Sequence, residues 1–558
     1  MWTAEEVDVR NVFRHIWAVS LAWPIVAVLA AGGVGTGCTE TQYVYDTTEV
    51  QRPAFNEPAD SLNGFIGLYD VGTNQTSCGN CHADFQARWA ATAHADAWAT
   101  LQGSGGAQPF CAGCHTVSEL GNALEVAGGY NVVTDSSYHN VQCESCHGPG
   151  LLHLESVAAG AVVRPFASIA VDTIGTNGCA GCHEGTHHPF VEQWRQSKHG
   201  YGGDAYLAEG SRAGCQDCHE GRFAISNKFG ETADFVEKGG TTMQPIVCAT
   251  CHDPHDATNR GQTRRPIDVP TRENLCVSCH SREGHPPSSN VTRRGPHAAQ
   301  GLLVIDEDVG YKPPNFQYDS TKIVSSHGTS ANPRLCASCH VYMFPVTDAA
   351  TGDFLLNSVG HTFEAIQCLD AQGLPTAGPC DLADRQFAGC AVSGCHTSED
   401  GARGAFIAAK ARMNFLVDQL WTDTDGDGVM ESTDGGLLPK VLTAAIGAGN
   451  LNEINLYDNV LTPAEGTIWN AQLAFTSERT VWSNFSVAGQ KSCTPAATCT
   501  TQGSSNTAHK SSGEGAHNPF LLEALLLASI QHLQTYYGVS SPPAANLTAQ
   551  LTAPPGLR

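Results

Sequence analysis

The chain has 558 residues and a formal net charge of −25; only 15% of its residues are charged, and it contains 58 glycines and 28 prolines. A chain of this length would ordinarily form three or four domains, but this much glycine and proline with so little charge fits loops better than a dense helical bundle. The acidic balance argues against nucleic acid as a partner.

Residues 1–37 are expected to form a signal peptide. Arg10 and Arg14 precede an apolar run over 16–31, which is short for a membrane span and suited to export. The run leads to Cys38 through a segment that resembles a bacterial lipobox, in which the cysteine becomes the first mature residue and carries lipid. We therefore expect an exported lipoprotein of the outer membrane, periplasmic or at the cell surface. Gly35 and the acidic residues near the start leave open another peptidase, a later start or a plain secreted precursor.

The motif Cys-x-x-Cys-His occurs eight times, and a ninth, stretched copy has four residues between its cysteines. In chain order the motifs, numbered sites 1 to 9, are Cys78/Cys81/His82, Cys111/Cys114/His115, Cys143/Cys146/His147, Cys179/Cys182/His183, Cys215/Cys218/His219, Cys248/Cys251/His252, Cys276/Cys279/His280, Cys336/Cys339/His340 and Cys390/Cys395/His396. This spacing predicts covalent c-type haem, with two thioether bonds and an axial imidazole. Zinc and disulfides are the alternatives for an isolated pair, and a disulfide beside an unrelated histidine remains one for site 9.

Sites 1 to 7 follow one another at a nearly regular step, which is typical of units that stack. We expect an eight-haem repeat region over 38–345 and a ninth-haem segment over 346–404. Short helices, for example over 83–101, should lie against the haems. The predicted fold is therefore mainly short α-helices and irregular loops wrapped around an extended array of c-type haems, with little β-structure.

Histidines outside the motifs are numerous enough to give every iron a second axial ligand, which would make the haems electron carriers. His94 lies twelve residues after His82, or about 18 Å along a helix, so it should serve a neighbouring haem. His255 follows His252 too closely to reach the opposite face of the same porphyrin, since three extended residues span about 10 Å. It too should serve the next haem.

Several stretches resemble the multihaem c-type cytochromes, including octahaem enzymes and extracellular electron conduits. They are Cys143-Glu-Ser-Cys-His-Gly-Pro-Gly with His153, Trp194 with Ser197 and His199, Cys248-Ala-Thr-Cys-His-Asp-Pro-His255, and Gly515-Ala-His517-Asn-Pro. The resemblance implies distal ligation by His153, His199, His255 and His517. Local context adds His94, His139, His188, His297, His327 and His361, so ten candidates compete for nine positions. His285, His509 and His532 are expected to be structural.

The remaining cysteines form two local pairs, Cys368 with Cys380 and Cys493 with Cys499, which an oxidising compartment would convert to disulfides; free thiols are the alternative. Residues 405–540 should be mainly helical, with helices over 406–421 and 520–536, and 541–558 should be a flexible tail. Between these helices a twelve-position loop predicts Ca²⁺ binding, with an acidic solvated turn as the alternative. Its ligands would be Asp423, Asp425, Asp427, Val429, Glu431 and Asp434.

The first hypothesis for function is electron transfer along about nine bis-His haems, to other redox proteins or an extracellular acceptor. The main rival is an oxidoreductase that acts on a small nitrogen or sulfur compound at one haem with an open coordination position. A subunit of an extracellular cytochrome filament, and hence a homo-oligomer, is the third. The family's usual mark of catalysis, lysine in place of the motif histidine, does not occur in the sequence.

Overall fold

The computed structural model describes residues 55–540 except 172–177, 186, 188, 204, 287–294, 307–308, 319–325, 330, 349, 371–373, 377–379, 393, 448–450, 455–459, 489–504 and 508–513. The signal-peptide prediction, Cys38, His188, the Cys493–Cys499 pair, His509 and the predicted tail therefore lie outside the described residues. Residues 54–558 form one compact unit, and the following description concerns that unit alone.

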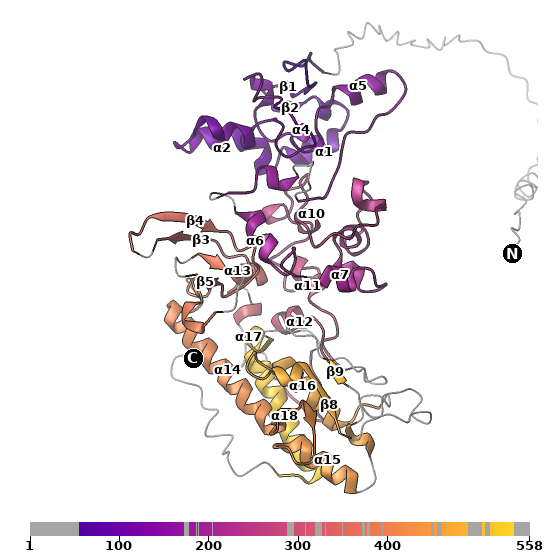
Figure 1. Cartoon of the computed structure of the whole chain (residues 1–558), viewed down its shortest axis with the longest axis vertical. Helices are drawn as coiled ribbons and strands as arrows, with labels where there is room; N and C mark the ends of the chain where they lie inside the picture. The colour runs from indigo at the N-terminus through magenta and orange to yellow at the C-terminus, as the bar shows by residue number, and fades with distance from the viewer. Residues whose placement is uncertain are drawn as a thin grey trace, which may run out of the picture. The chain divides into compact units, whose positions relative to one another are not determined.

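Helices are short throughout the part that carries the nine sites (Figure 1). They are α1 (Ala83–Trp89), α2 (Ala97–Gly103), α3 (Ala112–His115), α4 (Cys143–His147), α5 (Leu151–Ala158), α6 (Phe190–Gln196), α7 (Ala205–Glu209), α8 (Gln216–His219), α9 (Gly221–Phe223), α10 (Cys248–Cys251), α11 (Leu275–Cys279), α12 (Gln300–Ile305) and α13 (Cys336–His340). Loops and 3-10 turns connect them. The prediction of short helices and irregular loops with little β-structure is confirmed.

Strands form only small sheets. Three antiparallel pairs join β1 (Leu68–Asp70) to β2 (Gln75–Thr76), β3 (Phe344–Thr347) to β4 (Phe354–Ser358), and β5 (Cys368–Leu369) to β6 (Pro375–Thr376). In the fourth sheet β8 (Asn484–Val487) pairs in parallel with β7 (Val429–Met430) and in antiparallel with β9 (Ser505–Thr507). A disulfide between Cys368 and Cys380, with Cα atoms 5.8 Å apart, closes the β5–β6 segment.

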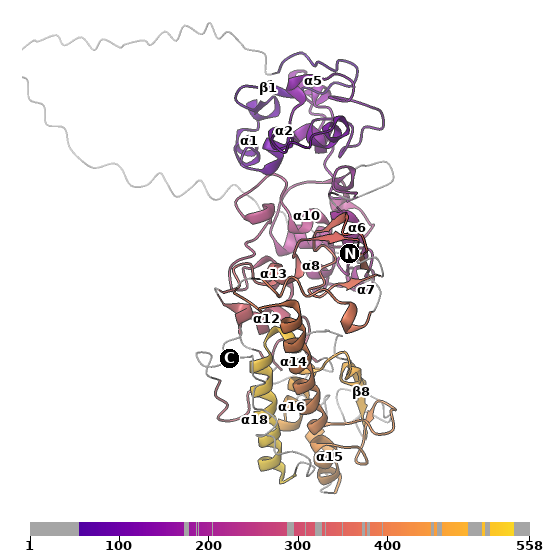
Figure 2. The same cartoon turned by 90° about the vertical axis from the view of Figure 1, so that its left-hand side faces the viewer.

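The C-terminal part differs because it has a conventional apolar core. Helices α14 (Glu399–Leu420), α16 (Pro463–Ala474) and α18 (Pro519–Tyr537) lie side by side in both views (Figures 1 and 2), with α15 (Leu437–Gly447) and α17 (Glu514–His517) at their ends. Leucines from all three long helices and the aromatic cluster of Trp421, Trp482 and Phe485 fill the interior.

Capping residues fix where these long helices begin. The side chain of Ser398 accepts a hydrogen bond from the backbone N–H of Gly401, and that of Asn518 accepts one from Leu521, with proline next in sequence. Both helices predicted in this part of the sequence are present, and α14 begins earlier than expected. In the described residues no helix has the length and apolar character needed to cross a bilayer.

The single helix predicted over 83–101 is wrong. The chain forms α1, a 3-10 turn over 93–96 and then α2. The hydroxyl of Thr92 donates a hydrogen bond to the carbonyl of Trp89 (2.7 Å), and the indole N–H of Trp89 donates to Val141 (2.9 Å). These bonds end α1 and turn the chain, so that His94 lies on a different element from His82.

Candidate functional site

The motifs of sites 1 to 8 each fold into about one turn of helix, which brings their cysteines and their histidine together, whereas site 9 forms turns and bends. The backbone N–H of the histidine donates to the carbonyl of the first cysteine, as in His82 to Cys78 (2.9 Å) and His252 to Cys248 (2.9 Å). In the stretched site 9, His396 still donates to Cys390 (3.1 Å). Gly394 absorbs the extra residues with a φ of 87°, which glycine adopts without strain.

A continuous cavity of about 2750 Å³ connects the sites. At least one cysteine of every site lines it, from Cys78 of site 1 to Cys390 of site 9. Eight of the nine motif histidines also line it, and apolar side chains such as Phe190, Val191 and Trp194 form much of the rest of its wall. A row of thiols and imidazoles on an apolar wall suits large, flat, apolar groups held covalently at one edge, which is the chemistry of c-type haem.

Among the described residues, seven motif histidines face a second histidine ring, with ring centres 6.0–6.4 Å apart. Two imidazoles that ligate one metal ion from opposite sides place their ring centres about 6.2 Å apart, because the metal–nitrogen bond is about 2 Å and the ring centre lies about 1.1 Å behind the nitrogen. The pairs, motif histidine first, are His82 with His153, His147 with His255, His183 with His94, His219 with His297, His252 with His361, His280 with His199 and His340 with His517. Each gap therefore has the width of an iron ligated from both sides.

Sites 9 and 2 differ from this pattern. Burial lowers the pKa of His327, and the charge of His396 lowers it further. Because this electrostatic effect requires proximity, His327 lies near site 9. At site 2 no described histidine ring lies opposite His115 at the spacing of the other pairs. The candidate His139 instead stacks on Trp98 (ring centres 4.3 Å apart) and does not line the cavity.

Backbone hydrogen bonds orient these rings for metal binding. The Nδ1 atoms of His115, His147, His252 and His340 lie 2.7–2.9 Å from the carbonyl oxygens of Ala97, Phe166, Gly261 and Phe363. A proton on Nδ1 leaves the Nε2 lone pair free for a metal. Burial lowers the pKa of His199 to about 3 and that of His361 to about 4, so both are neutral at physiological pH.

Facing histidines come from remote parts of the chain. His94, which follows site 1, faces His183 of site 4, so it lies opposite a motif other than its own. The expectation for His255 is wrong in direction. It follows site 6 but faces His147 of site 3 rather than the next motif, so the order of the sites along the chain does not fix which of them share histidines.

Contacts between motifs show which sites are neighbours. Thiol–thiol contacts join Cys78 to Cys143, Cys114 to Cys182, Cys179 to Cys248, Cys218 to Cys279 and Cys276 to Cys336. The electrostatic influence of Cys390 and Cys395 on Cys339 relates site 9 to site 8. These contacts relate site 1 to 3, 2 to 4, 4 to 6, 5 to 7, 7 to 8 and 8 to 9.

Two phenylalanines, which motif spacing does not reveal, bridge several sites. The ring of Phe190 lies 5.7 Å from His183 of site 4 and 4.8 Å from His361, which faces site 6. The ring of Phe363 lies 4.6 Å from His199, which faces site 7, and 5.4 Å from His361. Its carbonyl oxygen accepts the Nδ1 hydrogen bond of His340 in site 8.

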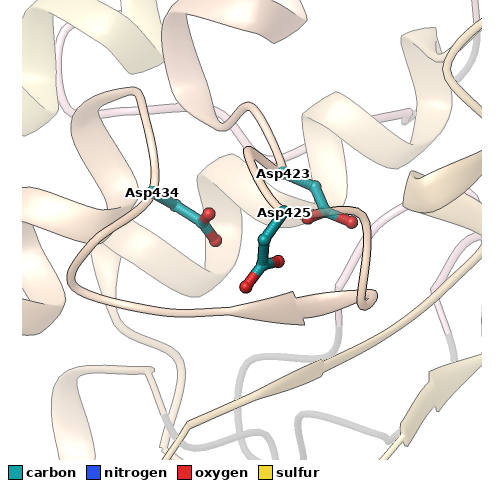
Figure 3. A group of neighbouring side chains, drawn as sticks. All are labelled: Asp423, Asp425 and Asp434. Atoms are coloured by element: carbon teal, nitrogen blue, oxygen red, sulfur yellow. The ribbon is translucent and has the colours of Figure 1, made fainter.

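The predicted calcium loop brings together half of its expected ligands. Oxygens of Asp423, Asp425 and Asp434 lie within 4.8 Å of one another, and Figure 3 shows the three carboxylates gathered inside the loop. Asp427 accepts a hydrogen bond from the N–H of Val429 (2.7 Å), and Glu431 accepts one from the hydroxyl of Thr433 (3.3 Å). Neither of these two acids belongs to the three-carboxylate cluster.

Two family models match parts of the chain. "Doubled CXXCH motif" matches residues 241–285, and "Cytochrome c554 and c-prime" matches 77–148. C-type polyheme cytochrome OmcB of Geobacter sulfurreducens is 27% identical over 234 residues, covering 36% of this chain and 29% of OmcB. Multiheme cytochrome MtrA of Shewanella baltica is 23% identical over 262 residues, covering 44% of this chain and 70% of MtrA. The chain thus spans less than a third of OmcB. No solved structure matches it.

Proposed function

Because the chain belongs to the multihaem c-type cytochrome family, we propose that it transfers electrons along nine covalently bound haems. The observation that carries this proposal is the repeated gap of 6.0–6.4 Å between facing histidine rings along one cavity. Imidazole on both sides saturates the iron and favours one-electron exchange over the binding of small molecules.

The haem group, when bound, supplies the one-electron chemistry, and the chain's residues hold and order the sites. The cysteines of each motif would fix one edge of the ring, and the paired histidines would fix its plane. Contacts such as Phe190 between sites 4 and 6, and Phe363 among sites 6, 7 and 8, support close spacing of neighbours. Close spacing matters because the rate of electron tunnelling falls exponentially with distance.

The test combines haem counting with a measurement of transfer. Intact mass after export with a haem-attachment system should correspond to nine haems. The reduced protein should then pass its electrons to a soluble ferric complex, with absorbance following the reoxidation. A mass without covalent haem, or reduced protein that the ferric complex does not reoxidise, would reject the proposal.

We propose in addition that the protein works outside the cytoplasm, attached to the outer membrane through a lipid on Cys38, and that its partners are other redox proteins or an extracellular acceptor. The lipobox-like segment before Cys38 and the requirement for haem attachment in an oxidising compartment support this location. A Cys38→Ser variant that stays with the membrane fraction would contradict the anchor.

A second candidate function, catalysis on a small nitrogen or sulfur compound, is favoured by site 2. His139, the local candidate for its second ligand, stacks on Trp98, whereas the Nδ1 of His115 is held by Ala97 as in the other sites. A haem held only by His115 would keep one open position. Electron paramagnetic resonance of the oxidised protein should then show a high-spin signal that shifts with nitrite, hydroxylamine or sulfite. Nine low-spin haems would exclude this candidate.

We also propose that the loop over 423–434 binds Ca²⁺. Three converging carboxylates support this proposal, since Ca²⁺ takes oxygen ligands. The site would stabilise the junction between α14 and β7, because Asp434 also accepts a hydrogen bond from the indole of Trp421 (2.9 Å) at the end of α14.

A further inference from the structure

Glu144 is a carboxylate inside the attachment motif of site 3, and its side chain is buried at the wall of the cavity. It is 2% exposed, and within the described part of the chain it forms no ion pair. Its oxygens instead accept three backbone hydrogen bonds, from Ile66 (2.9 Å), Gly67 (2.7 Å) and Gly150 (2.7 Å). Burying a carboxylate costs free energy unless the group is paired or hydrogen-bonded. The three backbone groups that donate to Glu144 therefore indicate which parts of the chain this side chain holds in place.

Two of these partners hold the attachment side of site 1. Ile66 and Gly67 in turn bind Ser77, whose N–H donates to the carbonyl of Gly67 (3.0 Å) and whose hydroxyl donates to that of Ile66 (3.3 Å). Ser77 directly precedes Cys78, the first cysteine of site 1. The thiol of Cys78 in turn touches that of Cys143, the residue before Glu144.

The third partner holds the opposite side of site 1. Gly150 is the N-cap of α5, and its carbonyl accepts the hydrogen bond of Leu154 (3.1 Å). His153 lies in the first turn of α5 and faces His82 with ring centres 6.4 Å apart. A Cβ atom on Gly150 would stand 2.9 Å from the Ile66 side chain and 3.2 Å from Oε1 of Glu144. A methyl group at this position would therefore press on both side chains.

We propose that Glu144 is a positioning residue that sets the second axial ligand of site 1 from within the motif of site 3. This inference rests on one part of the proposed function, namely that site 1 holds haem. Glutamate suits the role because two oxygens are needed, one shared by Ile66 and Gly150 and one for Gly67. Glutamine keeps a single acceptor oxygen, and alanine keeps none.

The experiment compares full-length, haem-loaded Glu144→Ala, Glu144→Gln and Gly150→Ala with the wild type, and with Glu125→Ala as an exposed control. Intact mass counts the haems, and electron paramagnetic resonance of the ferric protein counts high-spin iron. Glu144→Ala and Gly150→Ala should keep the wild-type haem number and gain up to one high-spin equivalent, which added imidazole reverses. Glu144→Gln should gain less, and the control should match the wild type.

A double variant separates positioning from a general effect on folding. His153→Ala should give one extra high-spin equivalent, and adding Glu144→Ala to it should give no more, since both changes remove the same ligand. High-spin iron that adds in the double variant, or an unchanged signal in both Glu144→Ala and Gly150→Ala, would overturn the inference. A wild type without haem would reject the proposed function instead.

Discussion

The burial of Glu144 predicts a local stability that depends on pH. Burial raises the pKa of Glu144 from 4.5 to about 7, against the pull of three N–H donors. The ionisable groups around it are the thiols of Cys78 and Cys143, which haem attachment would remove, and the hydroxyl of Tyr138. Because the folded state holds the proton more tightly than the unfolded state, stability is greatest below pH 4.5 and falls as pH rises to about 7.

The size of this effect follows from the rise in the pKa of Glu144 from 4.5 to about 7. At about 1.4 kcal/mol per pKa unit, the folded region should lose about 3.5 kcal/mol across this window, or roughly three-hundredfold in its opening equilibrium. Hydrogen exchange measured by mass spectrometry on peptides that contain Gly67 and Gly150, corrected for intrinsic rates, reports this opening. Protection should fall between pH 5 and pH 8 in the wild type and stay flat in Glu144→Gln. An equal slope in both proteins would refute the reasoning.

Three further outcomes are expected. Cys390→Ala with Cys395→Ala should lower the intact mass by one haem, and an unchanged mass would mean that site 9 carries none. Millimolar Ca²⁺ should raise the melting temperature of the wild type, since a site with a Kd near 10⁻⁴ M adds about 1 kcal/mol to the free energy of unfolding. Asp423→Asn should abolish this rise. A wild-type melting temperature that a chelator does not change would count against Ca²⁺ binding by the loop. Cys380→Ser should destabilise the β5–β6 segment by about 3 kcal/mol, the entropy of a loop of this length, seen as faster proteolysis there; equal cleavage rates would contradict this.

Local sequence accounted for the motifs, the small share of β-structure and helices such as α18. The same local arguments failed where contacts are long-range. The helix expected over 83–101 breaks because Thr92 and Trp89 find partners, one of which is Val141. His255 could be excluded from its own haem by chain length, but its true partner, His147, depends on how the chain returns on itself.

Residues that connect sites carry no signature in the sequence. Glu144 occupies an unspecified position of its motif, and Phe363 lies well after site 8. Their roles depend on backbone groups brought from elsewhere, such as the N–H of Ile66 or the ring of His199. A single sequence gives spacing along the chain, and these roles require distances through space.

The position of His517 has a consequence for biogenesis. All nine attachment motifs are complete by His396, yet the imidazole that faces site 8 belongs to the far end of the polypeptide. A nascent chain emerging N-terminus first exposes every attachment motif before that ligand. A full-length His517→Ala variant should keep the haem content of the wild type and leave the iron of site 8 with one imidazole, so a measurement of haem content alone would not detect the loss.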